Sequence, residues 1–321
     1  VHRITPLSPT SQSILATRLR RLSVPFVIGP LNGGVPWPAG FRDRQYAERE
    51  WLAHVRRLYR FMPAYTSTRR DASAILVGSR HTHMQMPQWC RDRCFYIPEN
   101  GIDRQRFSQV RTRSAELPIR FAFVGRLVPY KGVDLLIRAL EPYLQAGTVN
   151  LDVIGDGPEM QALQQLAGDV DPAGRIAFRG WLGHEDLQQH LRNCDVLALP
   201  SIREFGGGVV LEAMALGLAT IVADYAGPSE LVTDDTGIRV PFHDETSLID
   251  GLSDTVGGLV EAPAQIDDMG AAGRRCIDRL YSWEAKADQI SSIYEWVLGQ
   301  RSKPDELANF NVSPSDCLRR K

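Results

Sequence analysis

The sequence predicts an α/β protein with parallel β-sheets. From Ile119 onward, five short runs rich in apolar and β-branched residues alternate with stretches whose apolar residues recur at helical spacing. Consecutive parallel strands need long crossover connections, and helices usually supply them. This alternation therefore predicts a doubly wound sheet in the second half of the chain.

The elements of this half follow one another closely. We expect strands at 119–125, 150–155, 175–181, 195–201 and 219–224, and helices at 131–144, 158–168, 184–194, 209–217 and 228–234. Residues 283–300 have the pattern of a terminal amphipathic helix.

The first half carries fewer units. Residues 24–30 and 74–79 are predicted strands, 41–62 a long helical segment, and 93–103 a strand that ends in a turn. The polar, proline-terminated stretch 107–118 reads as a connection between domains. The division that we expect is a partial first domain at 1–112, a linker at 113–118, a second domain at 119–281, a terminal helix at 282–299 that packs back on the first domain, and a loose tail at 300–321.

The near-zero net charge hides an asymmetry. Residues 1–118 carry 19 Arg, no Lys and 8 acidic residues, whereas the remainder carries 18 basic and 30 acidic residues. The basic half suggests attraction to the acidic half across a cleft, or an anionic partner such as a lipid headgroup or a phosphorylated acceptor. A surface of solvated arginines explains the count equally well.

The chain has no apolar run of the ~20 residues that a membrane-spanning helix needs. Its first residues lack the pattern of a secretory signal, so we expect a cytoplasmic protein. The chain opens with Val1 in strand-like sequence, and we expect a fragment without its upstream part.

The five cysteines fit a reducing compartment because their number is odd and their spacing scattered. His81, His83, Cys90 and Cys94 cluster along the sequence, but their spacing matches no common zinc pattern, so local packing is the favoured interpretation. We therefore expect no metal site.

Ligands of open α/β sheets bind beyond the carboxyl ends of the strands. After the first strand of the second half come Gly125 and Arg126, and Lys131 opens the next helix. A cation at a helix entry interacts unfavourably with the helix dipole. A bound phosphate would offset this unfavourable interaction. Ordinary solubilising charges at a helix end are the alternative.

Glu204 and Glu212 flank the glycines Gly206, Gly207 and Gly208 after the strand at 195–201. Glycines at a helix entry allow a ligand to approach free N–H groups closely. A carboxylate accepts bonds from neighbouring hydroxyls, and a nucleotide sugar has hydroxyls at both ends with a diphosphate between. The spacing therefore predicts one glutamate at the sugar, one at the ribose, and cations and backbone at the diphosphate.

From Phe121 to Pro241 the sequence resembles the retaining glycosyltransferases of family 4, through "FVGRLVPYKG", "VIGDGPEM" and "REFGGGVVLEAMALG". The resemblance implies a GT-B fold, with two Rossmann-like domains facing across a cleft, the first one incomplete here. It implies that Arg126 and Lys131 bind the donor phosphates, Glu204 contacts the donor sugar and Glu212 holds the ribose. The implied catalytic residues are Arg126, Lys131 and Glu204. The remaining donor-binding residues would be Gly125, Trp181, Leu182, Phe205, Gly206, Gly207, Gly208, Val209 and Val210.

The likeness extends to the first half through "PFVIGPLNGG", which places Asn32, Gly33 and Gly34 on the acceptor side, and His2 stands where a histidine segment is expected. The function implied is metal-independent, cofactor-free transfer of a sugar from a nucleotide-sugar donor to a glycan or lipid-linked acceptor with retention. The partners expected are that donor, that acceptor and an anionic membrane at its inner face, contacted through basic residues of 1–118. No nucleic acid is expected.

Other functions stay open from the sequence. A GT-B epimerase or phosphorylase would keep the nucleotide-sugar site, although the spacing of the two glutamates argues against both. A non-catalytic nucleotide-sugar-binding protein or an inactive fragment would lack turnover. The G-x-G of 155–157 could suggest a dinucleotide-binding oxidoreductase, but Met160 stands where that motif needs a small residue.

Overall fold

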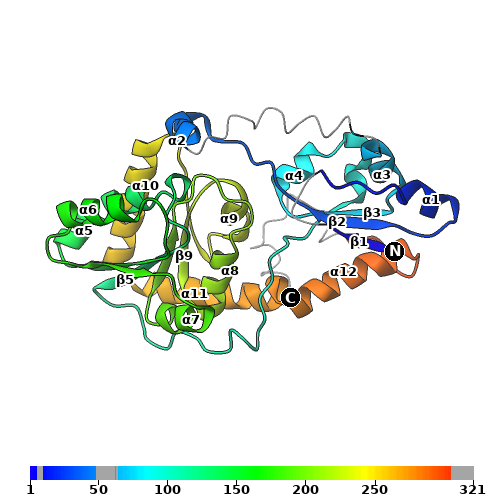
Figure 1. Cartoon of the computed structure of the whole chain (residues 1–321). Helices are drawn as coiled ribbons and strands as arrows, with labels where there is room; N and C mark the ends of the chain where they lie inside the picture. The colour runs from blue at the N-terminus through cyan, green and yellow to red at the C-terminus, as the bar shows by residue number, and fades with distance from the viewer. Residues whose placement is uncertain (6–9, 48–61, 63, 305–321) are drawn as a thin grey trace.

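The computed structural model describes residues 1–5, 10–47, 62 and 64–304 (Figure 1). The first sheet has the strand order β1-β2-β3-β4, and all of its neighbouring strands are parallel. Its strands are β1 (His2–Ile4), β2 (Val27–Leu31), β3 (Ala74–Val77) and β4 (Cys94–Tyr96). The helices among them are α1 (Ala16–Arg21), α3 (Tyr65–Asp71), α4 (Arg80–Gln85) and the 3-10 turn η3 (Gln88–Arg93).

The second sheet has the order β10-β9-β8-β5-β6-β7 and is parallel throughout. Its strands are β5 (Ile119–Val124), β6 (Val149–Ile154), β7 (Ile176–Gly180), β8 (Val196–Leu199), β9 (Ala219–Ala223) and β10 (Gly237–Val240). The order reverses between β5 and β8, so the helices that follow these two strands lie on opposite faces, and the two loops start side by side. A ligand site is expected at such a switch point.

Helices cover both faces of the second sheet. They are η4 (Pro129–Lys131), α5 (Val133–Gln145), α6 (Met160–Val170), α7 (His184–Leu191), α8 (Gly208–Leu216), α9 (Ala226–Leu231), α10 (Glu245–Glu261), α11 (Ala264–Cys276) and the π-helical turn η5 (Ile277–Tyr281). α5 packs on α6 and α10, and α8 packs on α7 and α11. The strands at the centre are buried on both faces, as parallel strands usually are.

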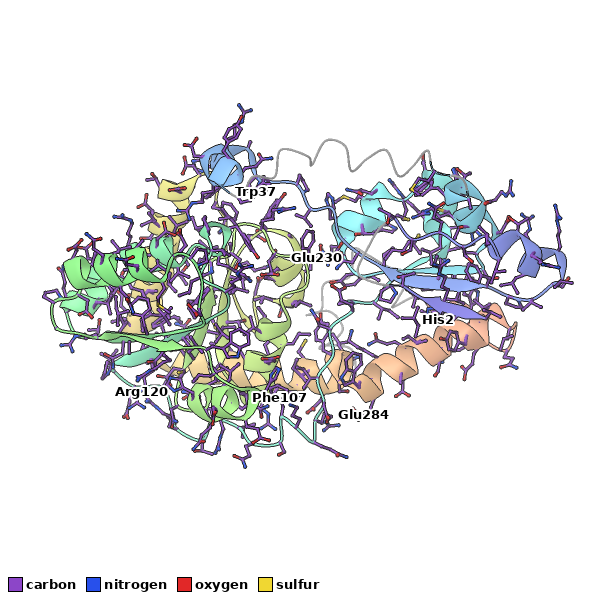
Figure 2. All side chains as sticks on the ribbon, viewed as in Figure 1. His2, Trp37, Phe107, Arg120, Glu230 and Glu284 are labelled. Atoms are coloured by element: carbon purple, nitrogen blue, oxygen red, sulfur yellow. The ribbon has the colours of Figure 1, made fainter. Side chains whose placement is uncertain are left out.

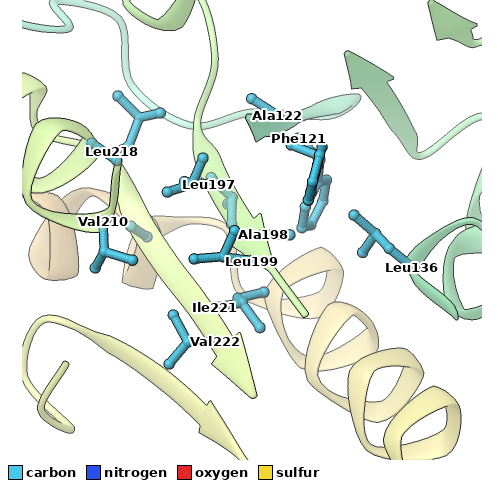
Figure 3. Packing of buried hydrophobic residues seen from close by; sticks show 14 of the residues in the cluster. Phe121, Ala122, Leu136, Leu197, Ala198, Leu199, Val210, Leu218, Ile221 and Val222 are labelled. Carbon is cyan, nitrogen blue, oxygen red and sulfur yellow. The ribbon is translucent and has the colours of Figure 1, made fainter. Parts of the chain in front are cut away.

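The core of this domain is continuous from β5 through β8 to β9. Phe121, Leu197 and Ile221 are at most 1% exposed, and Figure 3 shows them with Leu136 and Val210 from the neighbouring helices. Burying one such side chain contributes roughly 1.5–3 kcal/mol, so this cluster holds the loops at the sheet edge on a rigid base.

Two segments cross between the sheets. α12 (Trp283–Val297) continues from η5 of the second domain and runs along the first domain in Figure 1, where its Ile293 packs with Val27 and Phe95 of the first sheet. α2 (Arg42–Ala47) and the turn η1 (Ala39–Phe41) lie against the second domain, within the range 1–112 that we assign to the first. Arg44 holds α2 there through Asp134 at 2.6 Å and Glu245 at 2.5 Å.

The elements predicted from 119 to 234 are confirmed as β5 to β9 with α5 to α9, whereas β10, α10 and α11 were missed. Three glycines hide α10, because glycine is a poor helix former. Two of them are needed for packing: a Cβ at Gly251 would lie 2.7 Å from Val240, and one at Gly257 would lie 2.6 Å from the Tyr143 hydroxyl.

The sequence pattern did not predict α1 or α3 either. The predicted helical segment 41–62 begins with α2, and its residues 48–61 lie outside the described residues. Residues 305–321 of the predicted tail also lie outside them. None of the described helices is both long and apolar enough to cross a bilayer.

Candidate functional site

The loop after β5 lies at the carboxyl edge of the second sheet and carries Gly125, Arg126 and Lys131. It packs directly on the loop after β6, because a Cβ at Gly155 would lie 1.9 Å from the Gly125 carbonyl oxygen and one at Gly157 would lie 2.3 Å from that of Leu127. The G-x-G of this segment is thus explained by close backbone packing. Arg126 is exposed, and its side chain has no hydrogen-bond or ion-pair partner among the described residues.

Lys131 and Glu204 meet across the switch point. The backbone N–H of Ile202 donates to the Tyr130 carbonyl at 3.0 Å, which joins the loop after β8 to the loop after β5. The Lys131 Nζ then forms an ion pair with the Glu204 Oε2. Their side chains are 12% and 21% exposed, so this pair is partly desolvated and still open to a ligand.

The glycines after Glu204 form the entrance to α8. Gly207 has φ +60° at the N-cap, and a Cβ there would approach Pro228 to 3.1 Å. A helix start leaves unpaired N–H groups that favour an anion. Val210 is fully buried, so only its backbone could contact a ligand, while Val209 and Phe205 are partly buried.

Glu212 lies on α8 at the side of α7. Burial raises the pKa of its carboxyl, while the charges of His184 and Arg106 oppose that rise. Glu212 has no hydrogen bond or ion pair with the described residues, so its oxygens are available to hydroxyls. Leu182, two residues before α7, is partly buried, and Trp181 is 79% exposed.

The structure does not bring His2 to this group. His2 stands at the start of β1, where its Nδ1 contacts the Tyr294 hydroxyl at 2.6 Å and its Nε2 the Gly29 carbonyl at 3.2 Å (Figure 2). Burial lowers the pKa of His2. These contacts give the ring a packing role against α12.

Asn32, Gly33 and Gly34 lie after the carboxyl end of β2. The Asn32 amide donates to both Glu99 oxygens, at 2.8 and 2.9 Å, and its own oxygen accepts from the Gly33 N–H at 2.8 Å. Glu99 in turn lies near α8, because a Cβ at Gly206 would be 3.1 Å from its Oε1. The structure thus connects this segment to the glycines of α8 through Glu99.

Two further residues at the domain boundary, Arg203 and Glu230, were not predicted from the sequence. The Arg203 Nε donates to the Val35 carbonyl at 3.0 Å, with its guanidinium 5.4 Å from the Trp37 ring centre. Glu230 of α9 accepts from the Arg80 N–H at 3.1 and 2.9 Å, across to the first domain. Burial raises the pKa of Glu230, against the hydrogen bonds from Arg80 and Tyr96. The position of Arg203 next to Glu204 could have indicated a site residue. No local sequence feature indicated Glu230.

One group in the described part of the chain has ligand atoms close enough for a metal: those of Asp152, His190 and Cys194 lie within 4.8 Å of one another. Asp152 already accepts from Arg179 at 2.7 Å and contacts His190 at 2.9 Å. Burial raises the pKa of the Cys194 thiol to about 12. An ion pair packed beside α7 explains these residues, and a nearby guanidinium would repel a cation.

The cluster of His81, His83, Cys90 and Cys94 shows local packing contacts. The Cys94 thiol donates to the Cys90 carbonyl at 3.3 Å, and His81 contacts Gln85 at 2.5 Å. Both cysteines are buried in the core of the first domain.

Comparison with known proteins finds similarity to glycosyltransferases. Residues 118–257 match the family model of the glycosyl transferases group 1. The GDP-mannose-dependent monoacylated alpha-(1-6)-phosphatidylinositol monomannoside mannosyltransferase of Corynebacterium glutamicum is 35% identical over 180 residues, 53% of this chain and 45% of that protein. The GDP-mannose-dependent alpha-(1-6)-phosphatidylinositol monomannoside mannosyltransferase of Mycolicibacterium smegmatis is 30% identical over 256 residues, 72% of this chain and 65% of that protein. The chain thus spans about half to two thirds of these relatives.

Solved structures share the fold at low identity. Anabaena HepE in complex with UDP has a TM-score of 0.62 at 18% identity, covering 88% of this chain and 75% of that one. Sucrose-phosphate synthase from Thermosynechococcus elongatus has a TM-score of 0.61 at 21% identity, covering 89% of this chain and 71% of that one. With the matched family model and the ion pair at the switch point, these likenesses lead to one conclusion: residues 118–257 are similar to the glycosyl transferases group 1, and the chain has the GT-B fold.

Proposed function

We propose that this protein transfers a sugar from a nucleotide-sugar donor to a glycan or lipid-linked acceptor, with retention of the anomeric configuration and without a metal or cofactor. The observation that supports it best is the Lys131–Glu204 pair beside the glycine entrance of α8. A cation, a helix start and a carboxylate then surround one place, which suits a diphosphate joined to a sugar.

The donor would lie along the edge of the second sheet. Its ribose would bind Glu212, its diphosphate would bind Lys131, Arg126 and the backbone of Gly206–Val210, and its sugar hydroxyls would reach Glu204. Trp181 and Leu182 would lie near the base. Two relatives are named as GDP-mannose-dependent, so GDP-mannose is the first donor to test.

Catalysis would depend on positioning and on stabilising the negative charge that develops on the leaving diphosphate. Lys131 and Arg126 supply positive charge where that bond breaks, so no metal is required in this proposal. The acceptor would attack from the face that the diphosphate leaves, and the configuration would be retained. Asn32, Gly33 and Gly34 would lie on the acceptor side.

A membrane surface would present the acceptor. The end of the first domain that carries α1 exposes Ile14 at 86%, Leu15 at 54% and Leu22 at 66%. The exposed Arg18 and Arg21 lie among these apolar side chains. Anionic lipids attract such basic residues, and apolar side chains insert at the interface.

The deciding experiment incubates the protein with a panel of nucleotide sugars and acceptor lipids, with mass spectrometry of the products and NMR of the new anomeric centre. We expect one donor to give a product with its own configuration, unaffected by EDTA. Donor binding without turnover would favour a non-catalytic binding protein. Sedimentation with phosphatidylglycerol vesicles, compared with phosphatidylcholine, tests the membrane surface, and Arg18→Ser with Arg21→Ser should reduce the bound fraction.

A further inference from the structure

Asn100 follows the last strand of the first sheet and lies against the start of α8. A Cβ at Gly206 would be 2.6 Å from the Asn100 Nδ2, and one at Gly208 would be 3.6 Å from its Cγ. The side chain of Asn100 therefore covers the helix entrance where the proposed function places the diphosphate and sugar.

The backbone that follows Asn100 is held against the start of α12. The Ile102 N–H donates to the Tyr281 carbonyl at 2.8 Å, and the Trp283 N–H donates to the Ile102 carbonyl at 3.1 Å. Gly101 lies so close to the Trp283 ring that a Cβ would approach it to 2.8 Å. Asn100 is thus presented by a segment with little freedom to move.

Glu99 anchors the same segment from the other side. Its carboxylate accepts from Asn32 at 2.8 and 2.9 Å, and the neighbouring Pro98 carbonyl accepts from the Lys286 Nζ at 2.5 Å. Burial raises the pKa of Glu99, while the Asn32 hydrogen bonds and the Lys286 charge oppose that rise. The Glu99 side chain is therefore held by Asn32, which fixes the segment that carries Asn100.

The Asn100 amide itself has no hydrogen bond to any residue that the structure describes, and it is only partly buried. An amide offers two donor hydrogens and an acceptor oxygen, a set that matches adjacent sugar hydroxyls. Sugar hydroxyls can donate to that oxygen and accept from those hydrogens, whereas ionised phosphate oxygens only accept. The full hydrogen-bonding capacity of the amide is therefore met by the sugar rather than by the phosphates.

We infer that Asn100 binds the hydroxyls of the donor sugar and helps to select that sugar, with Glu99 and Asn32 as positioning residues. This inference depends on the proposed function. It assigns part of the donor pocket to the first domain, so the sugar would be enclosed only when both domains contribute.

The test is isothermal titration of the full chain with GDP-mannose and GDP, and with UDP-glucose and UDP. We expect Asn100→Ala to weaken binding of the nucleotide sugar by ~10-fold, while the matching nucleoside diphosphate stays within about twofold of wild type. The control is Asn193→Ala, an exposed asparagine at the end of α7 that donates to the Gln189 carbonyl. Circular dichroism checks that both variants fold.

Each other result has a definite meaning. Equal losses for sugar and diphosphate ligands would assign Asn100 a structural role and overturn the inference. Tighter binding by Asn100→Ala would show that the side chain blocks the site, which also overturns it. If the wild-type chain bound no nucleotide sugar of the panel used to test the proposed function, that function itself would fail, and the inference with it.

Discussion

Lys131 and Glu204 form an ion pair although 73 positions separate them along the chain. The pair exists because the loops after β5 and β8 leave the sheet side by side at its switch point. Before a ligand binds, the ion pair holds each side chain, so neither is free to contact a ligand without the other. We therefore expect their effects on ligand binding to be coupled.

Lys131→Met should weaken binding of GDP or UDP by roughly 10–100-fold, because charge-assisted bonds to phosphate are among the strongest hydrogen bonds. The variant also leaves the Glu204 carboxylate unpaired beside an anion. Adding Glu204→Gln should then recover part of the loss. Titration calorimetry measures both effects, with Lys303→Met as the control, and strictly additive losses would contradict the coupling.

Glu212→Ala should weaken nucleoside diphosphate binding by about tenfold. Without the Glu212 carboxylate, the two ribose hydroxyls of the bound nucleotide lose their hydrogen-bond acceptor. The wild-type protein should discriminate GDP from its 2′-deoxy form, and the variant should not. Glu185→Ala, on the exposed first turn of α7, provides a matched control. If the Glu212 variant still discriminated GDP from its 2′-deoxy form as well as wild type does, Glu212 would not bind the ribose.

Glu230 contributes to the contact between the domains, and Glu230→Ala should lower the free energy of unfolding by about 1–3 kcal/mol. The Arg80 N–H at the start of α4 would lose its acceptor, and a buried unpaired donor is costly. Nucleotide binding should change little, and turnover should fall far less than in Lys131→Ala or Arg126→Ala. Urea unfolding measures the first effect, and an unchanged midpoint and slope would contradict it.

Lys286 should make stability depend on pH. Burial lowers its pKa to about 7, against an unfolded value of 10.5, so the unfolded chain binds more protons between these two values. The free energy of unfolding should therefore rise with pH above 7, by at most about 1.4 kcal/mol per pH unit from this group. Lys286→Met should remove this rise.

Urea unfolding at pH 7, 8 and 9 checks that expectation for wild type and for both lysine variants. Lys303→Met is again the control, because Lys303 is only partly buried. A pH slope that persists in Lys286→Met would assign it to other groups.

Local sequence patterns determined much of the fold. The alternation of apolar runs predicted β5 to β9 with their helices, and the residues after β5 and β8 were predicted as a ligand site from their place after the strands. These features depend on side chains that are near one another in sequence, where strand and helix periodicity is read directly. The glycine-rich helix α10 escaped because its glycines serve contacts with distant residues.

Only the tertiary structure decided which residues meet. Three contacts join residues that no local pattern relates: the Lys131–Glu204 ion pair, the hydrogen bond from Arg80 to Glu230, and the contact of Asn100 with the start of α8. His2, which looked like a site residue, is instead held by Gly29 and by Tyr294 of the terminal helix. Such contacts follow from how whole domains pack through α2 and α12, and this packing depends on surfaces assembled from the entire chain.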